Sequence, residues 1–412
     1  MSDYKKYDII IMAVFRWNGP YSSTSIALAK TFSKNNRVFY INHPYSYKDY
    51  FQSKDEINKE LKSELKNGKI IYQKDKNLSD NFTSVIPPLT IPVNFLPKGF
   101  LYNSFSKINT RKIETTIRQT IKDHNIKEYI YINCFDPFFV PTLPADLKPA
   151  LNIYQCVDDI SQSEYLANHG VYLENEAVRQ ADLTLTTSTE LYKLKSGFTK
   201  NIHLLHNAAD TCTFNQALTN DYARPEELAK VEGPIIGYIG NLDEVRINYE
   251  LLKKTAIAHA DKNLVFIGPI NNTTYKTIGL DKLPNVLFIE NKTIDDLPPY
   301  IKYFDCAIIP FNCNQLTKSI YPLKINEYLA AGKAVVSTSF SEDIKSFSEV
   351  IFLTDSEEEF ITAIDKAVMA NSQKEIQQRV NVAKTNTWEA RTEQFWKIIE
   401  KYIPSKEKVK TP

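Results

Sequence analysis

Short and nearly uninterrupted apolar runs recur along the whole chain, and longer amphipathic stretches separate them. This alternation is typical of parallel sheets whose strands are buried on both faces and joined by crossover helices. The sequence therefore predicts an α/β protein. We expect strands at 8–12, 37–41, 128–133, 151–156, 183–186 and 201–205 in the first half, and at 235–239, 264–267, 286–289, 306–309, 334–337 and 350–353 in the second, with helices in the second half at 249–259, 294–303, 322–331 and 358–369.

A chain of 412 residues suggests two or three domains, because a domain usually takes roughly 150 residues, and the two successive sets of strands favour two. The junction lies near 215–233, where the polar run DYARPEELAKVEGP at 221–234 contains two prolines. We place a first domain at 1–220 and a second at 221–385. An amphipathic helix follows within 386–402, with Trp388, Phe395, Ile398 and Ile399 on or near one face.

Composition excludes several classes of protein. Fifty basic and forty-nine acidic residues leave a net charge of +1, so no global field attracts nucleic acid. No apolar run approaches the 18 or so residues of a membrane-spanning helix, and the apolar N-terminal stretch is more typical of a strand than of a signal peptide. The five cysteines lack CxxC spacing, which argues against a zinc or disulfide framework and favours a reducing compartment. We expect a cytoplasmic protein.

One segment fits neither predicted sheet. Residues 86–112 combine four prolines with many apolar and aromatic residues and end in basic ones. The favoured interpretation is a loop packed over the first domain, because exposed apolar loops usually find a core. The alternative is a membrane-surface element, in which apolar side chains enter the interface and Lys98, Lys107, Arg111 and Lys112 face anionic headgroups.

The predicted helix after Pro322 carries the strongest functional signal. Proline suits the first turn of a helix, and Gly332 lies just past its end. Lys324 and Glu327 are three residues apart and so share a face. A helix N-terminus favours an anion, and Lys324 places a positive charge in the first turn, where an anionic ligand would balance it. Glu327 is placed to accept hydrogen bonds from a ribose. The alternative is an ordinary surface ion pair.

The run YPLKINEYLAAGKAVVST closely resembles the donor-binding helix of glycosyltransferases with the GT-B fold, of the group 1/4 type. The segments GYIGNLDE at 237–244, 283–311 and 181–214 show the same resemblance, in the expected order. It implies two Rossmann-like domains that face each other across a cleft, with the terminal helix crossing back to the first. The second domain would bind a nucleotide diphosphate sugar and the first an acceptor, with no organic cofactor and no metal.

The resemblance also implies roles for single residues. Gly240 in the loop after the first strand of the second domain lets the backbone approach a diphosphate closely, while Arg246 is a phosphate ligand or a solvated surface arginine. The family pattern E-x₇-E has Glu327 as its second glutamate, but its first position is Ser319, so the residue that contacts the transferred sugar is absent. The predicted donor-binding residues are Gly240, Asn241, Arg246, Lys318, Tyr321, Leu323, Lys324 and Glu327.

In the first domain, the loop after the first strand corresponds to the family's glycine-bearing loop near the acceptor. We expect Arg16, Trp17 and Gly19 there to bind the acceptor, although a buried loop aromatic is the commoner fate of a residue such as Trp17. Asp158 and Asp159 end a strand, and burying charge is costly unless it is used or paired. Asp158 is the expected general base. Asp159 either contacts the acceptor or caps the following helix.

The sequence thus predicts a glycosyltransferase that moves a sugar to a hydroxyl of a glycan or lipid-linked acceptor in cell-surface polysaccharide synthesis. Possible peripheral contact with the membrane would come through 86–112. Two alternatives stay open: a nucleotide-sugar epimerase of the same fold, and a sugar-binding or partner protein without catalysis. No histidine pair has metal-binding spacing, so no metal site is expected.

Overall fold

The computed structural model describes residues 7–19, 23–52, 57 and 59–403. The chain forms two compact units, one made of Met1–His206 with Thr392–Pro412 and the other of Asn207–Arg391. The junction therefore lies earlier than the expected 220/221. The reason is that helix α7 (Thr211–Thr219) places Phe214 and Ala217 in the apolar core of the second unit.

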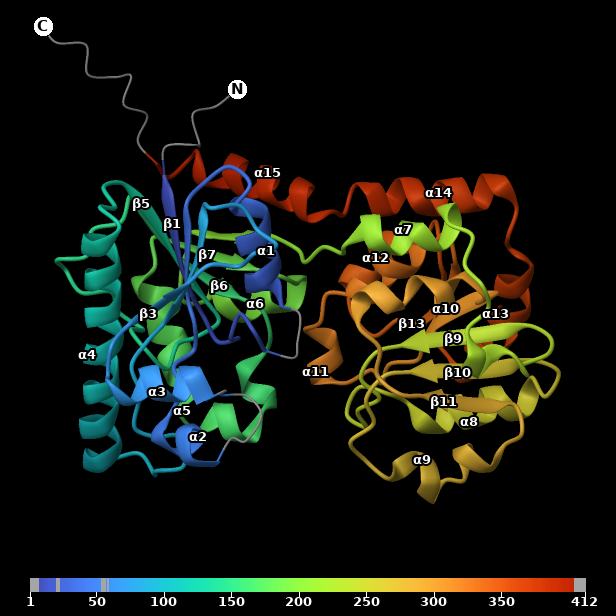
Figure 1. Cartoon of the computed structure of the whole chain (residues 1–412). Helices are drawn as coiled ribbons and strands as arrows, with labels where there is room; N and C mark the ends of the chain where they lie inside the picture. Colours follow the sequence, from blue (N-terminus) through green and yellow to red (C-terminus); the bar gives the residue numbers. More distant parts are fainter. Residues whose placement is uncertain (1–6, 20–22, 53–56, 58, 404–412) are drawn as a thin grey trace, which may run out of the picture. The chain divides into compact units, whose positions relative to one another are not determined.

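The first unit is built on an eight-stranded sheet in the order β3-β4-β2-β1-β5-β6-β7-β8, in which β3 alone is antiparallel to its neighbour (Figure 1). All six residues of β1 are buried, as expected of a central strand covered on both faces. Its strands are β1 (Asp8–Ala13), β2 (Val38–Ile41), β3 (Ile71–Gln73), β4 (Phe82–Ile86), β5 (Tyr129–Cys134), β6 (Leu151–Cys156), β7 (Leu183–Thr186) and β8 (Ile202–Leu204). Its helices are α1 (Thr24–Phe32), α2 (Tyr47–Gln52), α3 (Lys59–Lys66), α4 (Phe100–Asp123), α5 (Glu164–Gln180) and α6 (Thr189–Ser196).

The second unit holds a six-stranded parallel sheet in the order β11-β10-β9-β12-β13-β14. Its strands are β9 (Ile235–Ile239), β10 (Asn263–Ile267), β11 (Val286–Ile289), β12 (Cys306–Ile309), β13 (Ala334–Thr338) and β14 (Phe352–Thr354). Besides α7, its helices are α8 (Tyr249–Ala258), α9 (Thr274–Thr277), α10 (Pro298–Lys302), α11 (Gln315–Lys318), α12 (Leu323–Ala330), α13 (Glu357–Met369) and α14 (Gln373–Lys384). The order reverses between β9 and β12, which is the place where parallel α/β sheets bind ligands at their carboxyl edge.

The terminal helix α15 (Trp388–Ile399) packs on the first unit, as predicted. Its Phe395 and Trp396 contact Phe32 of α1, with ring centroids 4.9 and 5.9 Å away. Phe395 and Ile399 are almost fully buried. The C-terminus therefore completes the core of the N-terminal unit.

Residues 86–112 are not the loop that was expected. Residue 86 ends β4, and the second half of the segment is the beginning of the 24-residue helix α4. The Asn109 side chain of α4 accepts from the N–H of Ile91 in the remaining loop and donates to the Ile91 carbonyl, at 2.8 and 2.7 Å. Lys112 Nζ donates to the Leu89 carbonyl at 2.5 Å. The loop is thus tied to the helix that follows it.

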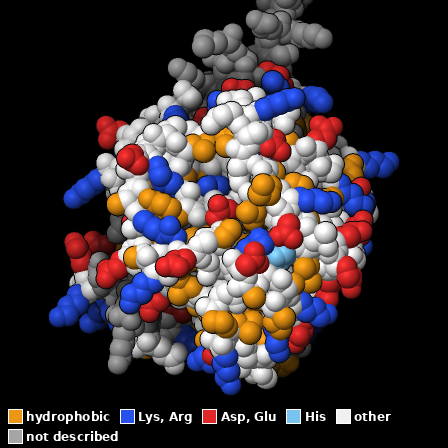
Figure 2. Space-filling view, turned by 90° about the vertical axis from the view of Figure 1, so that its right-hand side faces the viewer, with side chains coloured by type: hydrophobic (Ala, Val, Ile, Leu, Met, Phe, Trp, Pro, Cys, Tyr) orange, Lys and Arg blue, Asp and Glu red, His pale blue; other side chains and the backbone are white. Residues whose placement is uncertain are grey.

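Charges of both signs are interspersed on the face that Figure 2 presents, in agreement with the near-zero net charge. Among the described residues, no helix is both long enough and apolar enough to cross a membrane.

Candidate functional site

Helix α12 is fixed to the carboxyl end of β9. The Tyr328 hydroxyl accepts a hydrogen bond from the Ile239 N–H at 2.8 Å, and both residues are buried. This contact places the first turn of α12 beside the residue that follows β9, which is Gly240. The carboxyl end of β9 and the first turn of α12, both predicted to bind the donor, are therefore held next to each other.

Gly240 and Lys324 touch directly. Gly240 has φ +146°, and a Cβ atom there would lie 2.3 Å from Lys324 Cε and 2.8 Å from Nζ. Lys324 Nζ lies 3.7 Å from Glu327 Oε2, and the two side chains keep 26% and 19% of their surface exposed. The structure thus brings together three of the predicted donor-binding residues, and their charged ends remain accessible to a ligand.

A second glycine, which the sequence analysis missed, completes this surface. Gly268 follows β10 with φ +144°, and a Cβ there would lie 2.2 Å from the Gly240 carbonyl oxygen. The Gly240 backbone therefore leaves no room for a side chain at position 268. The Gly-Pro pair that ends a buried strand was the signal that could have revealed it.

The loop that carries Arg246 is held by two asparagines, also missed. Asn312 donates to the carbonyls of Glu244, Val245 and Ile247 at 3.1–3.3 Å, and Asn314 donates to that of Val245 at 2.7 Å. The Arg246 guanidinium is 38% exposed, and its Nε lies 3.7 Å from an Asp243 carboxylate oxygen. That buried Nε makes no hydrogen bond to the described residues.

Electrostatics link these groups through Tyr238. Burial raises the pKa of the Tyr238 hydroxyl, which stays protonated and donates to the Asn241 carbonyl at 3.2 Å. Arg246, Asp243 and Glu327 also act on that pKa, which places all three in one neighbourhood. Helix α12 has no side-chain cap and no acidic residue in its first turn. Its positive end and two cations thus share one small region of the second unit, which favours an anionic ligand.

The other predicted donor residues have varied surroundings. Lys318 is exposed at the end of α11, and Leu323 is half-buried in the first turn of α12. Tyr321 is buried, and its hydroxyl lies 3.4 Å from both Asn386 Oδ1 and Asn326 Nδ2. Ser319 is buried, and its hydroxyl donates to the Leu316 carbonyl at 2.7 Å. The Ser319 side chain therefore stabilises the C-terminal turn of α11.

In the first unit, Trp17 is a core residue. It is 8% exposed, its ring centroid lies 4.0 Å from that of Phe82, and its Nε1 donates to Asp75 at 2.8 Å. An acceptor bound on this indole would have to displace that packing, so the alternative of a buried loop aromatic describes Trp17. Gly19 closes a turn through its N–H to the Arg16 carbonyl at 3.0 Å.

Arg16 organises the loop after β2. Its guanidinium donates to the carbonyls of His43 and Pro44, both at 3.2 Å, pairs with Asp49 at 3.1 Å and lies 3.9 Å above the Tyr45 ring centroid. The predicted acceptor-side arginine therefore lies at the carboxyl edge of its sheet and positions the neighbouring loop.

Asp158 and Asp159 follow β6 and have different environments. Asp159 accepts from Ser161 N at 3.0 Å and Ser161 Oγ at 2.6 Å, so it caps the short helical turn that follows. The capping alternative describes Asp159, and no ligand is needed to explain its carboxylate. Asp158 is half-buried at the same sheet edge. Among the described residues, no group of three or more His, Cys, Asp or Glu side chains could hold a metal ion.

The chain is similar to known proteins in sequence and in fold. Residues 233–369 match the family model of glycosyl transferases group 1. Solved structures match over nearly the whole chain. An E. coli trehalose-6-phosphate protein bound with UDP-2-fluoro glucose has 11% identity and a TM-score of 0.65, and the match covers 97% of this chain and 100% of that one. The sucrose-phosphate synthase of Thermosynechococcus elongatus has 13% identity and a TM-score of 0.66, and the match covers 96% of this chain and 99% of that one. The chain has the GT-B fold. The GT-B protein HepE of Anabaena, in complex with UDP-glucose, matches at 12% identity and TM-score 0.62, covering 95% of this chain and 99% of that one.

One curated relative aligns in sequence. It is TuaH of Bacillus subtilis (strain 168), named as a glycosyltransferase of teichuronic acid biosynthesis, and it is 26% identical over 235 residues. The match covers 54% of this GT-B chain and 58% of TuaH, so it spans little more than half the length of that relative.

Proposed function

We propose that this chain is a glycosyltransferase, which moves a sugar from a nucleotide diphosphate sugar to a hydroxyl of a glycan or lipid-linked acceptor. The observation that carries the proposal is the contact between Gly240 and Lys324 at the uncapped start of α12. The match of residues 233–369 to glycosyl transferases group 1 supports the reaction class. The alignment with TuaH supports cell-surface polysaccharide as the destination of the sugar.

The donor is proposed to be a UDP-sugar bound by the second unit. Its diphosphate gains negative charge as the bond to the sugar breaks, and preorganised cations stabilise that charge best. Lys324, Arg246 and the N-terminus of α12 supply this stabilisation. The glycines at 240 and 268 leave space for the diphosphate, and Glu327 accepts from the ribose hydroxyls. UDP is favoured because HepE and the E. coli protein are bound to UDP-sugars.

The acceptor is proposed to lie at the carboxyl edge of the first sheet. Arg16 lines a cavity of about 300 Å³ there. Asp158, half-buried after β6, is the candidate that the sequence offers for the base that takes the proton of the attacking hydroxyl, and it is tested against a second candidate below. Ser319 supplies no carboxylate where the family pattern has one, which favours direct displacement with inversion.

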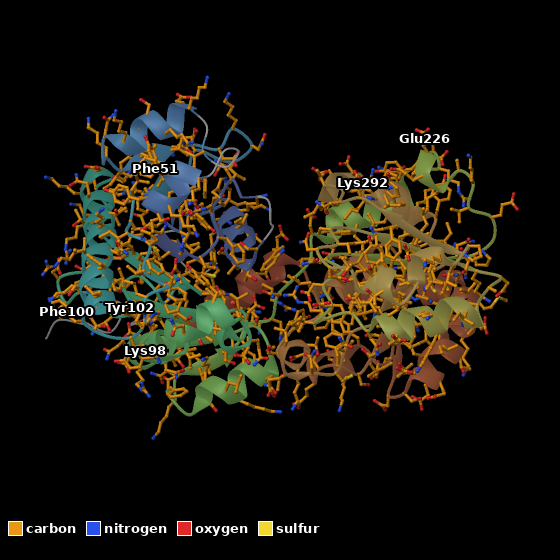
Figure 3. The ribbon with its side chains drawn as sticks, turned by 90° about the horizontal axis from the view of Figure 1, so that it is seen from below. Phe51, Lys98, Phe100, Tyr102, Glu226 and Lys292 are labelled. Atoms are coloured by element: carbon orange, nitrogen blue, oxygen red, sulfur yellow. The ribbon has the colours of Figure 1, made fainter. Side chains whose placement is uncertain are left out.

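The test begins with a thermal-shift screen of UDP, GDP and ADP and their sugars, since a ligand that binds only the folded state raises the melting temperature. Release of nucleoside diphosphate is then measured with and without sugar acceptors. Lys324→Met should lower turnover by about 100-fold or more, as loss of one preorganised charge does elsewhere. Lys292→Met is the matched control, because Lys292 pairs with Glu227 elsewhere on the same unit and should leave turnover unchanged (Figure 3).

The outcomes separate the alternatives. Acceptor-dependent release supports the transferase, conversion of the donor without acceptor indicates an epimerase, and an intact donor after long incubation indicates a binding or partner protein. If Lys324→Met keeps full turnover, Lys324 does not contribute to the reaction and the proposed role of this lysine is wrong.

We also propose that the enzyme works at the inner face of the plasma membrane through residues 86–112. Phe95, Phe100 and Leu101 are 70%, 83% and 58% exposed, and Lys98 and Lys107 beside them are exposed cations. Lys98 and Phe100 are on either side of Gly99, the residue that caps α4, at the same end of this helix (Figure 3). Apolar side chains flanked by lysines suit an interface with anionic headgroups. Lys112 is excluded from this role, because its ammonium is bound to the Leu89 carbonyl.

Vesicle co-flotation checks this contact. The protein should float with vesicles that contain anionic lipid and float less with neutral ones. Replacing Phe100 and Leu101 by serine should abolish flotation, whereas Met369→Ser, which removes an equally exposed apolar side chain from the second unit, should not. Equal flotation of all variants would contradict the proposal.

A further inference from the structure

A histidine and an aspartate form a pair at the carboxyl edge of the first sheet. His43 follows β2, Asp136 follows β5, and these strands flank β1. His43 Nδ1 lies 2.7 Å from Asp136 Oδ2. The aspartate side chain has no exposed surface, while that of the histidine is 29% exposed. The two residues are 93 positions apart in the sequence, and the sheet order brings them together.

The carboxylate is held in place by its own loop. The Asn133 side chain accepts from the Asp136 N–H at 2.9 Å and donates to its carbonyl at 3.0 Å. Phe135 and Val140 on either side have φ +62° and +50°, a region that residues other than glycine rarely occupy. Such conformations persist only where the surroundings enforce them, and they gather at functional sites. The second oxygen of Asp136 is buried without a hydrogen bond to the described residues, which leaves its charge directed to His43.

The geometry fixes the state of the imidazole. A carboxylate can only accept a hydrogen bond, so the neutral imidazole has its proton on Nδ1 and its lone pair on Nε2. His43 lines the cavity of about 300 Å³ that also contains Arg16, Asp49, Asn109 and Tyr165. Asp136 does not line it, so the ring edge that bears Nε2 faces this space. No described residue bonds to Nε2. An imidazole with an oriented, unbonded Nε2 in a cavity is suited to accept a proton from a bound hydroxyl.

We propose that His43 is the general base of the transfer reaction and that Asp136 is the residue that positions it. This rests on the proposed transferase function. As the acceptor oxygen bonds to the sugar carbon C1, its proton passes to Nε2, and the bond from C1 to the diphosphate oxygen breaks with its electron pair on the leaving nucleoside diphosphate. The imidazolium, stabilised by Asp136, then returns its proton to solvent. The acceptor is a hydroxyl small enough at its reacting end to enter the cavity.

The deciding variant is His43→Asn, whose side-chain amide can still donate to Asp136 but has no basic nitrogen. Transfer from a UDP-sugar should fall by about 100-fold or more in kcat, the usual contribution of a general base, while KM for the donor stays within about twofold. Exogenous imidazole should restore part of the turnover of His43→Ala. His124→Asn, which changes a histidine at the end of α4, is the control and should keep full turnover.

Asp136→Asn tests the positioning role through a signal that packing alone would not change. In ¹⁵N-histidine NMR spectra, the wild-type His43 should show a protonated Nδ1 and an unprotonated Nε2, and Asp136→Asn should alter that ratio while lowering kcat. If this variant does not fold, His43→Asn and imidazole rescue still decide the matter.

The outcomes distinguish this inference from the proposed function. A wild-type protein that transfers no sugar to any acceptor overturns the proposed function. An active wild type with equally active His43→Asn overturns the histidine assignment alone, and loss of turnover in Asp158→Asn at the same time returns the role of base to Asp158.

Discussion

The Lys324 side chain occupies the space where a side chain on residue 240 would begin, with only 2.3 Å between Lys324 Cε and a Cβ built on Gly240. Gly240→Ala should therefore push the lysine out of its position and force alanine into a φ of +146°. We expect weaker binding of nucleoside diphosphate and only a small fall in the melting temperature, because Lys324 can move aside and the backbone strain of the alanine is the cost that remains. Calorimetric titration of wild type and variant with UDP checks this, and unchanged affinity would contradict it.

Gly268→Ala should behave differently, although it lies beside Gly240. Its Cβ would meet the Gly240 carbonyl oxygen at 2.2 Å, and a backbone atom cannot move aside as a lysine side chain can. We expect a loss of stability of the second unit, seen as a lower unfolding temperature, in addition to weaker nucleotide binding. A variant as stable as the wild type would show that the two loops can separate without cost.

Glu327 should recognise the ribose. A hydrogen bond to a charged group contributes about 1.5–3 kcal/mol, so Glu327→Gln should weaken UDP binding by about tenfold or more. The wild type should also bind UDP better than 2′,3′-dideoxy-UDP, and the variant should lose most of that preference. If both proteins discriminate equally, another group reads the sugar and Glu327 only pairs with Lys324.

The buried pair of Glu174 and Lys195 should be important for stability of the first unit. The ammonium bonds directly to the carboxylate, which also accepts from Tyr154 and Cys156 at 3.1 and 3.3 Å. Glu174→Gln leaves Lys195 without its counter-charge, at a cost of about 3–5 kcal/mol. Combining it with Lys195→Met should recover part of that loss in urea denaturation. A double variant no more stable than the single one would contradict this.

The free energy of unfolding should increase as the pH becomes alkaline, because the buried Lys333 loses its proton. Burial lowers the pKa of its ammonium to about 8, and Nζ donates to the carbonyls of Lys302 and Phe304. Between about pH 8 and the ordinary value of 10.5, the unfolded chain binds more protons at this site than the folded one, so the site's contribution to stability grows with pH. The full change is about 3 kcal/mol.

Lys333→Met isolates this contribution, because other titrating groups are common to both proteins. The free energy of unfolding of the wild type, minus that of the variant, should increase between pH 7 and pH 10 in urea denaturation experiments. A difference that does not depend on pH would show that the ammonium is not destabilised by burial.

Most strands and helix α12 could be predicted from the sequence, because each depends on a local pattern. Apolar runs such as Ile235–Ile239 have few alternatives to a buried strand, and the helical spacing of Lys324 and Glu327 places them on one face. Residues 86–112 misled because their four prolines end at residue 97, directly before α4 begins at Phe100.

The missed parts of the site depend on contacts between distant segments. Gly268 matters only because β10 pairs with β9 and brings it against Gly240. His43 and Asp136 are far apart in the sequence, and only the strand order β2-β1-β5 brings them together. For Trp17, packing on Phe82 agrees with the interpretation as a buried residue, which was already the commoner one. A local sequence pattern does not show which distant segments will be in contact.

The placement of α15 has a consequence for how the protein is made. The partners of Phe32, which are Phe395 and Trp396, are synthesised only after all of Asn207–Arg391, which follows Phe32 in the chain. Since folding during synthesis usually proceeds from the N-terminus, the second unit can mature while the first still lacks a helix. A nascent chain that stalls before residue 395 would expose the apolar side of α1, where a chaperone could bind it or a neighbouring chain could aggregate with it.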